Sequence, residues 1–284
     1  MILMKYACLG KTELKVSELC FGVLPMGPLQ TNVPLAEGAD VLLAAMQNGV
    51  NFFDTAQMYQ TYPYLRRALD NYPNEIILSS KSTAADYAAM EKAVVEGLRE
   101  MRRDYFDIFF LHAARATMSD LQKRAGAWQC LQDYKQKGHL RYIGVSTHVV
   151  DVVRGLSDVP EVDVIFSLIN MAGKGILGGS ADDMRRAVET AAQAGKGQYS
   201  MKVLGGGTLL SNYREAIAYA RAISAYDAHA VGITNMGELD MALRTFNGQP
   251  VTDEEISRIK TGKAWVLMEM LCKGCGLCVQ RCPS

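Results

Sequence analysis

YFDIFFLHAARATMSDLQKRAGAWQCLQDYKQKGHLRYIGVS, residues 105–146, contains one complete strand–helix–strand unit. Residues 105–112 and 141–146 are short apolar runs rich in aromatic or β-branched residues, and this composition predicts buried strands. Residues 118–138 have helical periodicity and end at a glycine, as many helices do. Two strands joined by a helix predict one unit of a parallel sheet.

The same alternation continues along most of the chain. Further helix-like segments occupy residues 35–49, 87–101 and 181–195. Strands that are each followed by a helix predict an α/β fold of the (β/α)₈ TIM-barrel type, in which catalytic groups lie at the C-terminal ends of the strands. A doubly wound parallel sheet is the alternative. The eight strands are predicted at residues 17–22, 50–54, 75–81, 105–112, 141–146, 162–168, 198–204 and 229–234.

The composition is that of an ordinary soluble globular protein. Apolar residues make up 49% of the chain and charged residues 21%, and the formal net charge is zero. Nothing in this balance indicates binding to nucleic acid or to an anionic membrane. No apolar run reaches the roughly 18 residues of a membrane span, and the first residues lack the features of a secretion signal. We therefore expect a cytoplasmic protein.

Four polar residues fall where predicted strands end. Asp54, Lys81 and His112 lie at the ends of the second, third and fourth predicted strands, and Tyr59 lies just beyond the second. On a barrel, these side chains share the face where the chemistry of the fold takes place. Singly, each has a simpler explanation, such as a helix cap for Asp54, a solvated lysine, or a buried hydrogen-bonded phenol or imidazole.

Together, these residues have the chemistry of proton transfer to a carbonyl oxygen. A free phenol has a pKa of about 10, which is poorly matched to neutral pH. We expect Lys81 to lower the pKa of Tyr59, and Asp54 to keep the amine charged and in place. Tyr59 is then the general acid, and His112 orients the carbonyl oxygen. The other histidines, His139, His148 and His229, are expected to be structural or surface groups.

Five segments surround or follow these residues: VNFFDTAQMY (50–59), ILSSKS (77–82), YFDIFFLH (105–112), LRYIGVS (140–146) and MKVLGGGTL (201–209). They resemble, in chain order, segments of the aldo/keto reductases, which are (β/α)₈ oxidoreductases with an Asp-Tyr-Lys-His tetrad. The similarity extends from about residue 7 to residue 246. It implies a catalytic tetrad of Asp54, Tyr59, Lys81 and His112, NAD(P)H as cofactor and a small carbonyl compound as substrate.

The resemblance is less complete at the nicotinamide contacts. Where the family has Ser-Asn after the fifth strand, this chain has Ser146-Thr147. Phe166 stands where the family has a glutamine that holds the nicotinamide carboxamide. Ser146 is therefore implied as a cofactor contact, while two polar contacts are changed.

Two later segments are implied as phosphate contacts. Lys202, Gly205 and Gly206 resemble the family's pyrophosphate-binding loop, where backbone N–H groups approach phosphate oxygens. A flexible turn is the alternative for this loop. Thr234 and Asn235 open a helix whose N-terminus is expected to receive an adenosine phosphate. The basic 2′-phosphate pattern of the family is absent, so NAD and NADP both remain open.

GKGILG, residues 173–178, matches the G-x-G-x-x-G pattern of dinucleotide-binding folds. That pattern also requires an acidic residue at the end of the next strand, about 20 positions further on. The corresponding segment of this chain has none. We therefore interpret residues 173–178 as a loop between a strand and a helix.

The chain ends in CKGCGLCVQRCPS, residues 272–284, which holds four of its seven cysteines. Cys272, Cys275, Cys278 and Cys282 have the C-x₂-C-x₂-C-x₃-C-P spacing of bacterial ferredoxins and predict a [4Fe–4S] cluster in a reducing compartment. A Cys₄ zinc site is the alternative. Either Cys282 is the fourth ligand of this cluster, or the fourth ligand lies beyond the end of this chain.

Two parts are therefore expected, a barrel over residues 1–248 and, over residues 249–284, a linker helix that begins near Thr252 and an iron–sulfur tail. The combination resembles a branch of the aldo/keto reductases with a ferredoxin-like tail. The first hypothesis is a hydride-transferring oxidoreductase. The second is a docking or redox-sensing module whose cluster exchanges electrons with a protein partner. The tetrad favours the first, whereas Thr147 and Phe166 favour the second.

Overall fold

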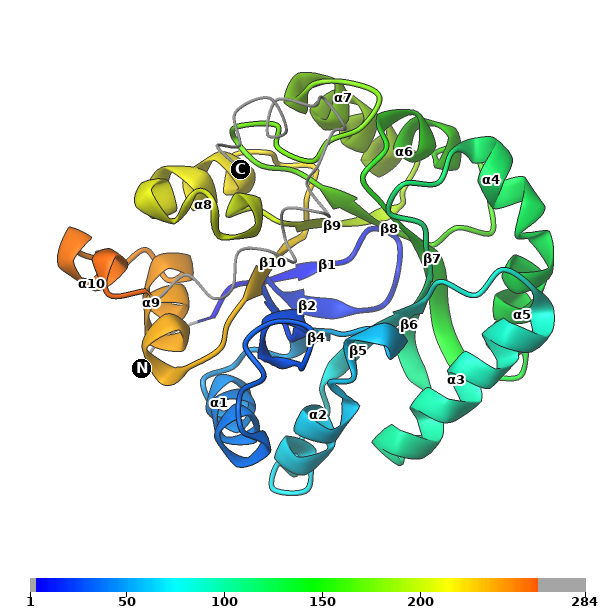
Figure 1. The fold of residues 1–284 in the computed structure, drawn as a ribbon. Coiled ribbons are helices and arrows are strands. Elements are labelled where there is room, and N and C mark those ends of the chain that lie inside the picture. The colour runs from blue at the N-terminus through cyan, green and yellow to red at the C-terminus, as the bar shows by residue number, and fades with distance from the viewer. Residues whose placement is uncertain (1–3, 260–284) are drawn as a thin grey trace, which may run out of the picture.

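The fold is a closed barrel of eight parallel strands surrounded by helices (Figure 1), seen in a computed structural model that describes residues 4–259. The strands follow one another in chain order, and β10 pairs with β3 to close the barrel. A doubly wound sheet has two open edges, so the predicted barrel is confirmed. The barrel strands are β3 (Leu19–Gly22), β4 (Phe52–Asp54), β5 (Ile77–Ser82), β6 (Phe106–His112), β7 (Leu140–Thr147), β8 (Val164–Leu168), β9 (Gly197–Met201) and β10 (Ala228–Gly232).

A helix follows every barrel strand, as predicted. Within residues 4–259, none of the helices is long and apolar enough to cross a membrane. The segment at residues 173–178 is a loop between β8 and α7, also as predicted. The helices are α1 (Leu35–Gln47), α2 (Tyr62–Leu69), α3 (Tyr87–Met101), α4 (Met118–Lys123), α5 (Ala125–Gln136), α6 (Val150–Leu156), α7 (Ala181–Gln193), α8 (Tyr213–Arg221), α9 (Met236–Phe246) and α10 (Asp253–Ser257).

The helix predicted over residues 118–138 is divided in two at Arg124. This residue leaves the helical conformation, with φ −99° and ψ 22°. Its guanidinium donates hydrogen bonds to the backbone oxygens of Ala84, just after β5, and of His112, the last residue of β6. The break therefore serves a tertiary contact that helical periodicity does not reveal.

An N-terminal hairpin was not predicted from the sequence. Strands β1 (Tyr6–Cys8) and β2 (Lys15–Ser17) pair with each other in antiparallel orientation, outside the barrel sheet. Leu9 and Leu14 of the connecting loop and Val16 pack in one buried cluster with residues inside the barrel, among them Phe52 and Ile108. The hairpin therefore covers the end of the barrel where the strands begin.

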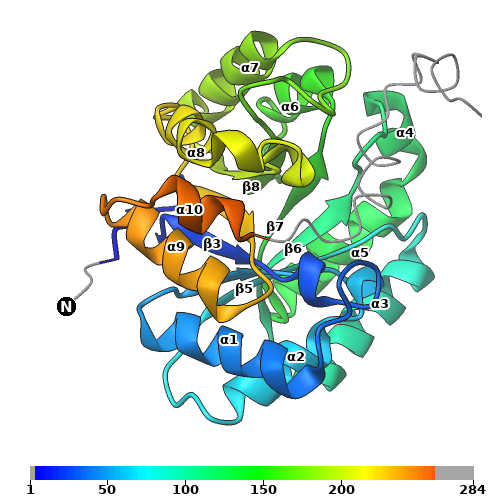
Figure 2. The same cartoon turned by 60° about the vertical axis from the view of Figure 1, so that its left-hand side comes forward.

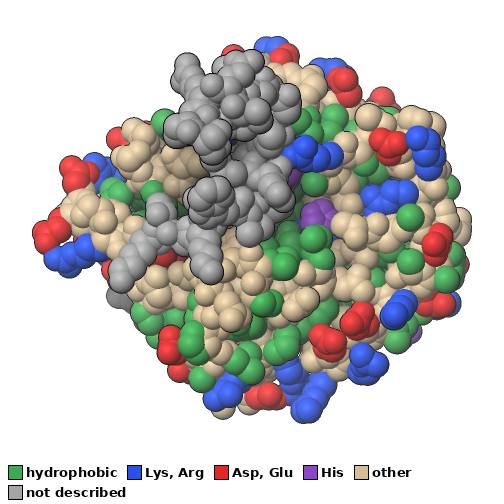
Figure 3. Space-filling model, viewed as in Figure 1, with side chains coloured by type: hydrophobic (Ala, Val, Ile, Leu, Met, Phe, Trp, Pro, Cys, Tyr) green, Lys and Arg blue, Asp and Glu red, His purple; other side chains and the backbone are tan. Residues whose placement is uncertain are grey.

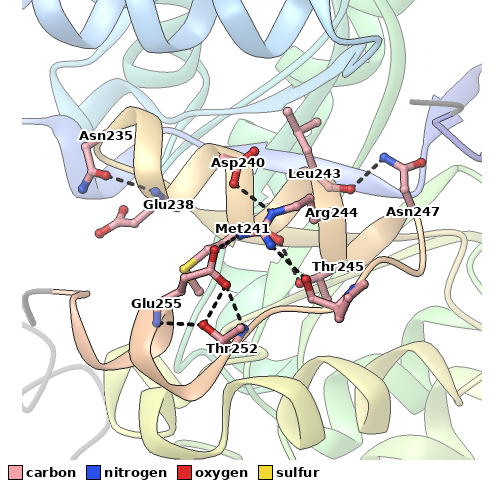
Figure 4. Close-up of polar contacts among 11 residues, drawn as sticks. Asn235, Glu238, Asp240, Met241, Leu243, Arg244, Thr245, Asn247, Thr252 and Glu255 are labelled. Carbon is pink, nitrogen blue, oxygen red and sulfur yellow. Dashed lines mark hydrogen bonds and ion pairs between the residues drawn. The ribbon is translucent and has the colours of Figure 1, made fainter. Parts of the chain in front are cut away.

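Helix α10 is fixed against α9 by a network of polar side chains (Figures 2 and 4). Arg244 of α9 donates to Asp240 at 2.8 Å and to Glu255 of α10 at 2.5 Å. Thr252 and Glu255 form a capping box, which confirms the predicted helix start near Thr252. After α10, Ile259 lines the main cavity of the barrel. Cys272, Cys275, Cys278 and Cys282 lie outside the described residues, and the predicted boundary after residue 248 remains a prediction.

Candidate active site

The barrel brings the four predicted catalytic residues to one end of the sheet. Asp54 and His112 are the last residues of β4 and β6, and Lys81 is the fifth of six residues in β5. Tyr59 ends the short 3₁₀ helix η2 (Gln57–Tyr59) that follows β4. A cavity of about 390 Å³ opens here, lined by Asp54, Tyr59 and His112. The view of this face shows histidine among hydrophobic side chains (Figure 3).

Asp54 and Lys81 form a buried ion pair at the base of this group. The Lys81 Nζ donates to Asp54 Oδ2 at 2.6 Å and to the Thr55 carbonyl oxygen at 2.8 Å. Asp54 Oδ1 accepts from Ser79 Oγ at 2.9 Å and from the Tyr199 hydroxyl at 3.1 Å. These partners stabilise both charges in a buried position. Asp54 is therefore not a helix cap, and Lys81 is not a solvated lysine.

Tyr59 lies between this ion pair and His112. Its ring centroid is 4.8 Å from Lys81 Nζ, and its ring meets that of His112 edge to face at 6.1 Å. Burial, reinforced by the charge of Asp54, raises the pKa of Tyr59 well above its usual value. The prediction of a lowered pKa is therefore wrong: Lys81 is paired with Asp54, and the cost of desolvating the phenolate outweighs the attraction of the nearby ammonium. Tyr59 is a neutral phenol at physiological pH.

His112 is held as a neutral imidazole. Burial lowers its pKa to about 3, and the charges of Lys81, Lys202 and Arg124 act in the same direction. Its Nδ1 is buried and has no hydrogen-bond partner among residues 4–259. A neutral imidazole can donate only one N–H, which suits it to orient an oxygen rather than to carry charge.

The predicted nicotinamide contacts divide into two groups. Ser146 Oγ is buried and finds no partner within the described chain, as expected of a group that meets a ligand. Thr147 Oγ1 instead accepts from the Val149 backbone N–H at 3.1 Å. Phe166 lines the cavity and stacks on Tyr199, with ring centroids 3.9 Å apart. An apolar ring thus occupies the position where the sequence resemblance implies an amide.

The glycine-rich loop follows β9 as a 3₁₀ turn, η3 (Gly205–Gly207). All three glycines have positive φ, and Lys202 before them also adopts the left-handed conformation, with φ 57°. A Cβ at Gly205 would lie 2.8 Å from Thr208 Oγ1, so a side chain would not fit there. Lys202, Gly206 and Gly207 all line the cavity. The loop therefore presents backbone and one lysine to the cavity.

At the far end of the cavity, α9 begins with a closed cap. The Asn235 side chain accepts from the Glu238 N–H at 3.0 Å. The Glu238 carboxylate accepts from the backbone N–H and the hydroxyl of Thr234, at 2.7 and 2.9 Å. Thr234 and Glu238 line the cavity. An acidic group therefore lies at the helix N-terminus where an adenosine phosphate was predicted.

Three residues of this site were not predicted from the sequence. His148 was expected to be structural or on the surface, but it is 3% exposed and lines the cavity beside His112. Its place two residues after a predicted strand was a usable signal. Tyr199 could have been found from the alternation of β9, which directs it into the barrel. Glu238 lies three residues inside a predicted helix, and only the fold brings it to the cavity.

No group of three or more His, Cys, Asp or Glu side chains able to hold a metal is found in residues 4–259. Cys20 and Cys130 are buried in β3 and α5, as expected of core thiols, and Cys8 is exposed. The four clustered cysteines lie beyond this range. Their predicted role therefore depends on sequence spacing alone.

Comparison with known proteins gives concordant results. The model of the aldo/keto reductase family matches residues 18–225. L-galactose dehydrogenase from Arabidopsis thaliana is 30% identical over 174 residues, 56% of this chain and only 54% of that protein. The uncharacterized oxidoreductase YqkF of Bacillus subtilis (strain 168) is 23% identical, over 89% of this chain and 94% of its own. The holo form of aldo-keto reductase AKR11C1 from Bacillus halodurans is similar in fold, with a TM-score of 0.71 and 19% identity over 95% of this chain and 97% of that one.

Proposed function

Because the chain belongs to the aldo/keto reductase family, we propose that it transfers a hydride between NAD(P)H and the carbonyl or alcohol carbon of a small molecule. The observation that carries this proposal is the convergence of Asp54, Tyr59, Lys81 and His112 at one cavity. These residue types supply a proton donor and an oxygen-orienting group side by side, as carbonyl reduction requires.

Each residue has a distinct part in the proposed reaction. Tyr59, kept protonated by burial, donates its proton to the carbonyl oxygen during reduction and takes it back during oxidation. The N–H of neutral His112 orients the same oxygen. Lys81, fixed by Asp54, places a positive charge 4.8 Å from the Tyr59 ring and stabilises the phenolate left after proton transfer. Bound NAD(P)H would supply the hydride.

The cavity suits a dinucleotide by its chemistry. Lys202 Nζ and Ser146 Oγ are buried polar atoms without a partner in the described part of the chain, and Lys202 lines the cavity, where a ligand could supply one. Gly206 lines the cavity with Lys202, and Gly205 is buried within the same turn. We assign Ser146 to the nicotinamide end, the backbone of the loop at Lys202, Gly205 and Gly206 to the pyrophosphate, and the α9 cap, Thr234 and Asn235, to the adenosine.

We further propose that Cys272, Cys275, Cys278 and Cys282 bind a [4Fe–4S] cluster that transfers electrons to a protein partner or senses redox state, as in the ferredoxin-tailed branch of the family. Their spacing supports this assignment. Iron, sulfide and zinc analysis of anaerobically purified protein tests it. About four irons and four sulfides per chain are expected. Stoichiometric zinc in place of iron would overturn the assignment.

Titration of the metal-loaded protein with NADH and NADPH, monitored by fluorescence, separates the hydride-transfer hypothesis from the docking and redox-sensing one. Saturable binding of either nucleotide is expected, because the cavity and its unpartnered donors suit a dinucleotide. Absence of saturable binding would exclude the hydride-transfer proposal. The docking and sensing alternative, which the apolar ring of Phe166 favours, would then remain.

A further inference from the structure

Two basic side chains of the cavity, Lys202 and His148, are buried without a hydrogen-bond partner for their nitrogens. The Lys202 Nζ and the His148 Nδ1 are both inaccessible to solvent, and no partner is found for either among residues 4–259. Both residues line the cavity that holds Tyr59 and His112. Buried polar groups in native proteins nearly always have partners, so an exception calls for an explanation, and for two groups on the wall of one cavity a bound ligand supplies it.

The backbone fixes both residues in position. The His148 N–H donates to the Ala114 oxygen at 3.0 Å, and its carbonyl accepts from Leu177 N–H at 2.9 Å. Lys202 has the left-handed conformation, and its carbonyl accepts from the Gly205 N–H at 2.8 Å. Two groups of this kind, carried by the ends of separate strands, form a prepared site rather than two mobile surface side chains.

The electrostatics of this site favour a negatively charged ligand. The charge of Lys202 lowers the pKa values of both His148 and His112, in addition to the larger effect of burial. The charge of Arg115 likewise lowers the pKa values of Lys202 and His148.

The acids that line the cavity within the described chain do not serve Lys202. These are Asp54, which is paired with Lys81, and Glu238, which is bound to Thr234. A buried ammonium beside two imidazoles thus lacks a counter-charge from this part of the protein, and an oxyanion would supply it.

We propose that Lys202 and His148 form an oxyanion-binding site next to Tyr59 and His112. The ammonium supplies the charge, and the imidazole supplies a hydrogen bond to a second oxygen. Two sources of the oxyanion share this chemistry, namely a carboxylate on the substrate and the phosphates of the dinucleotide. The choice of these two sources rests on the proposed function, whereas the site itself is inferred from the side chains of Lys202 and His148.

Calorimetric titration of the full chain with inorganic pyrophosphate, and of the NADH-loaded chain with oxamate, tests this site. We expect saturable binding of at least one probe, weakened about tenfold or more by Lys202→Met and by His148→Phe, because each removes a charge or a donor. Lys137→Met and His139→Phe are matched controls with exposed side chains and should leave binding unchanged. Failure of both probes to bind, or binding unaffected by both site variants, would overturn the proposal.

The source of the oxyanion follows from the same measurements. If pyrophosphate competes with NADH and both variants weaken NADH binding, the site takes the dinucleotide phosphates. If NADH binding is unchanged but oxamate binding is lost, it takes a substrate carboxylate. Lys202-dependent pyrophosphate binding without any NADH binding would leave the oxyanion site standing and reject the proposed hydride transfer.

A stability measurement guards against misfolded variants. Lys202→Met removes a buried charge without a partner, so the variant is expected to unfold at the same temperature as the parent chain or a higher one. Lys202→Arg, which keeps the charge, should retain more oxyanion binding than Lys202→Met. Equal loss in both would contradict a charge-based site.

Discussion

Glu238 is the residue expected to set the preference between the two nicotinamide cofactors. Its carboxylate lies at the start of α9 and lines the cavity end assigned to the adenosine. A 2′-phosphate there would meet a like charge, whereas a ribose hydroxyl could donate to the carboxylate. We therefore predict a preference for NAD over NADP, a choice that the sequence left open.

Glu238→Gln should shift this preference while keeping the hydrogen bond from Thr234. We expect the ratio of NADPH to NADH dissociation constants to fall about tenfold, which corresponds to about 1.4 kcal/mol. Fluorescence titration of both nucleotides measures it. Asp240→Asn, which removes a charge that pairs with Arg244 on the same helix, is the control. An unchanged ratio in Glu238→Gln would contradict this assignment.

Lys202 should make stability depend on pH in the alkaline range. Burial lowers its pKa to about 8, below the value of 10.5 for an unperturbed lysine. Between these values the unfolded chain binds more protons, so the contribution of Lys202 to stability rises with pH, by at most about 3 kcal/mol. Urea unfolding at pH 7.5 and about pH 10 should show this rise in the parent chain and a smaller one in Lys202→Met. Equal pH dependence in both chains would contradict a buried, unpartnered ammonium.

At this scale the sequence was a good guide to position and a poorer guide to protonation. The ends of predicted strands located Asp54, Tyr59 and Lys81 together, because the ends of parallel strands meet at one edge of the barrel. The pKa of Tyr59 depends on how deeply the phenol is buried and on where the Lys81 ammonium points. Neither can be deduced from chain order.

Among the elements, α10 depends most on its cap. It has only five residues, and an isolated helix of that length is not stable in water. Thr252→Ala removes the side-chain partner of the Glu255 N–H and should destabilise the helix by about 1 kcal/mol. The amide of Ile256, which donates to the Thr252 carbonyl, should then exchange about fivefold faster with deuterium. Thr190→Ala is the control, because the Thr190 side chain donates to the Arg186 oxygen within α7 and caps no helix N-terminus. Unaltered exchange at Ile256 would show that packing rather than capping holds α10.

The elements that could not be predicted from the sequence share one physical property, which is that contacts distant in sequence determine them. Strands β1 and β2 have three residues each, too few to display a period, and their stability comes from Leu9, Leu14 and Val16 packing under the barrel. The break at Arg124 likewise serves carbonyl groups distant in sequence. Longer segments, such as α3, were predicted to the residue because their own periodicity and caps define them.

The whole molecule was predictable because one unit repeats eight times. The barrel strands are buried almost throughout, and the longer helices such as α1, α3 and α7 bury one face, so the repeated pattern specifies a closed barrel better than any single segment does. Ile259, two residues after the end of α10, lines the cavity, so the last described residue lies on the active-site face.

The central claim is that the chain transfers a hydride to a carbonyl carbon while Tyr59 donates the proton. Following a deuterium label tests it most directly. Full-length protein is mixed with NADH deuterated at C4 and an aldehyde probe such as 4-nitrobenzaldehyde, and deuterium in the alcohol product is measured by mass spectrometry. The parent chain should transfer deuterium to the carbonyl carbon. Tyr59→Phe should bind NADH equally well and transfer at least about a hundredfold more slowly, the range expected for loss of a general acid. Undiminished transfer by Tyr59→Phe, with NADH binding intact, would contradict the account.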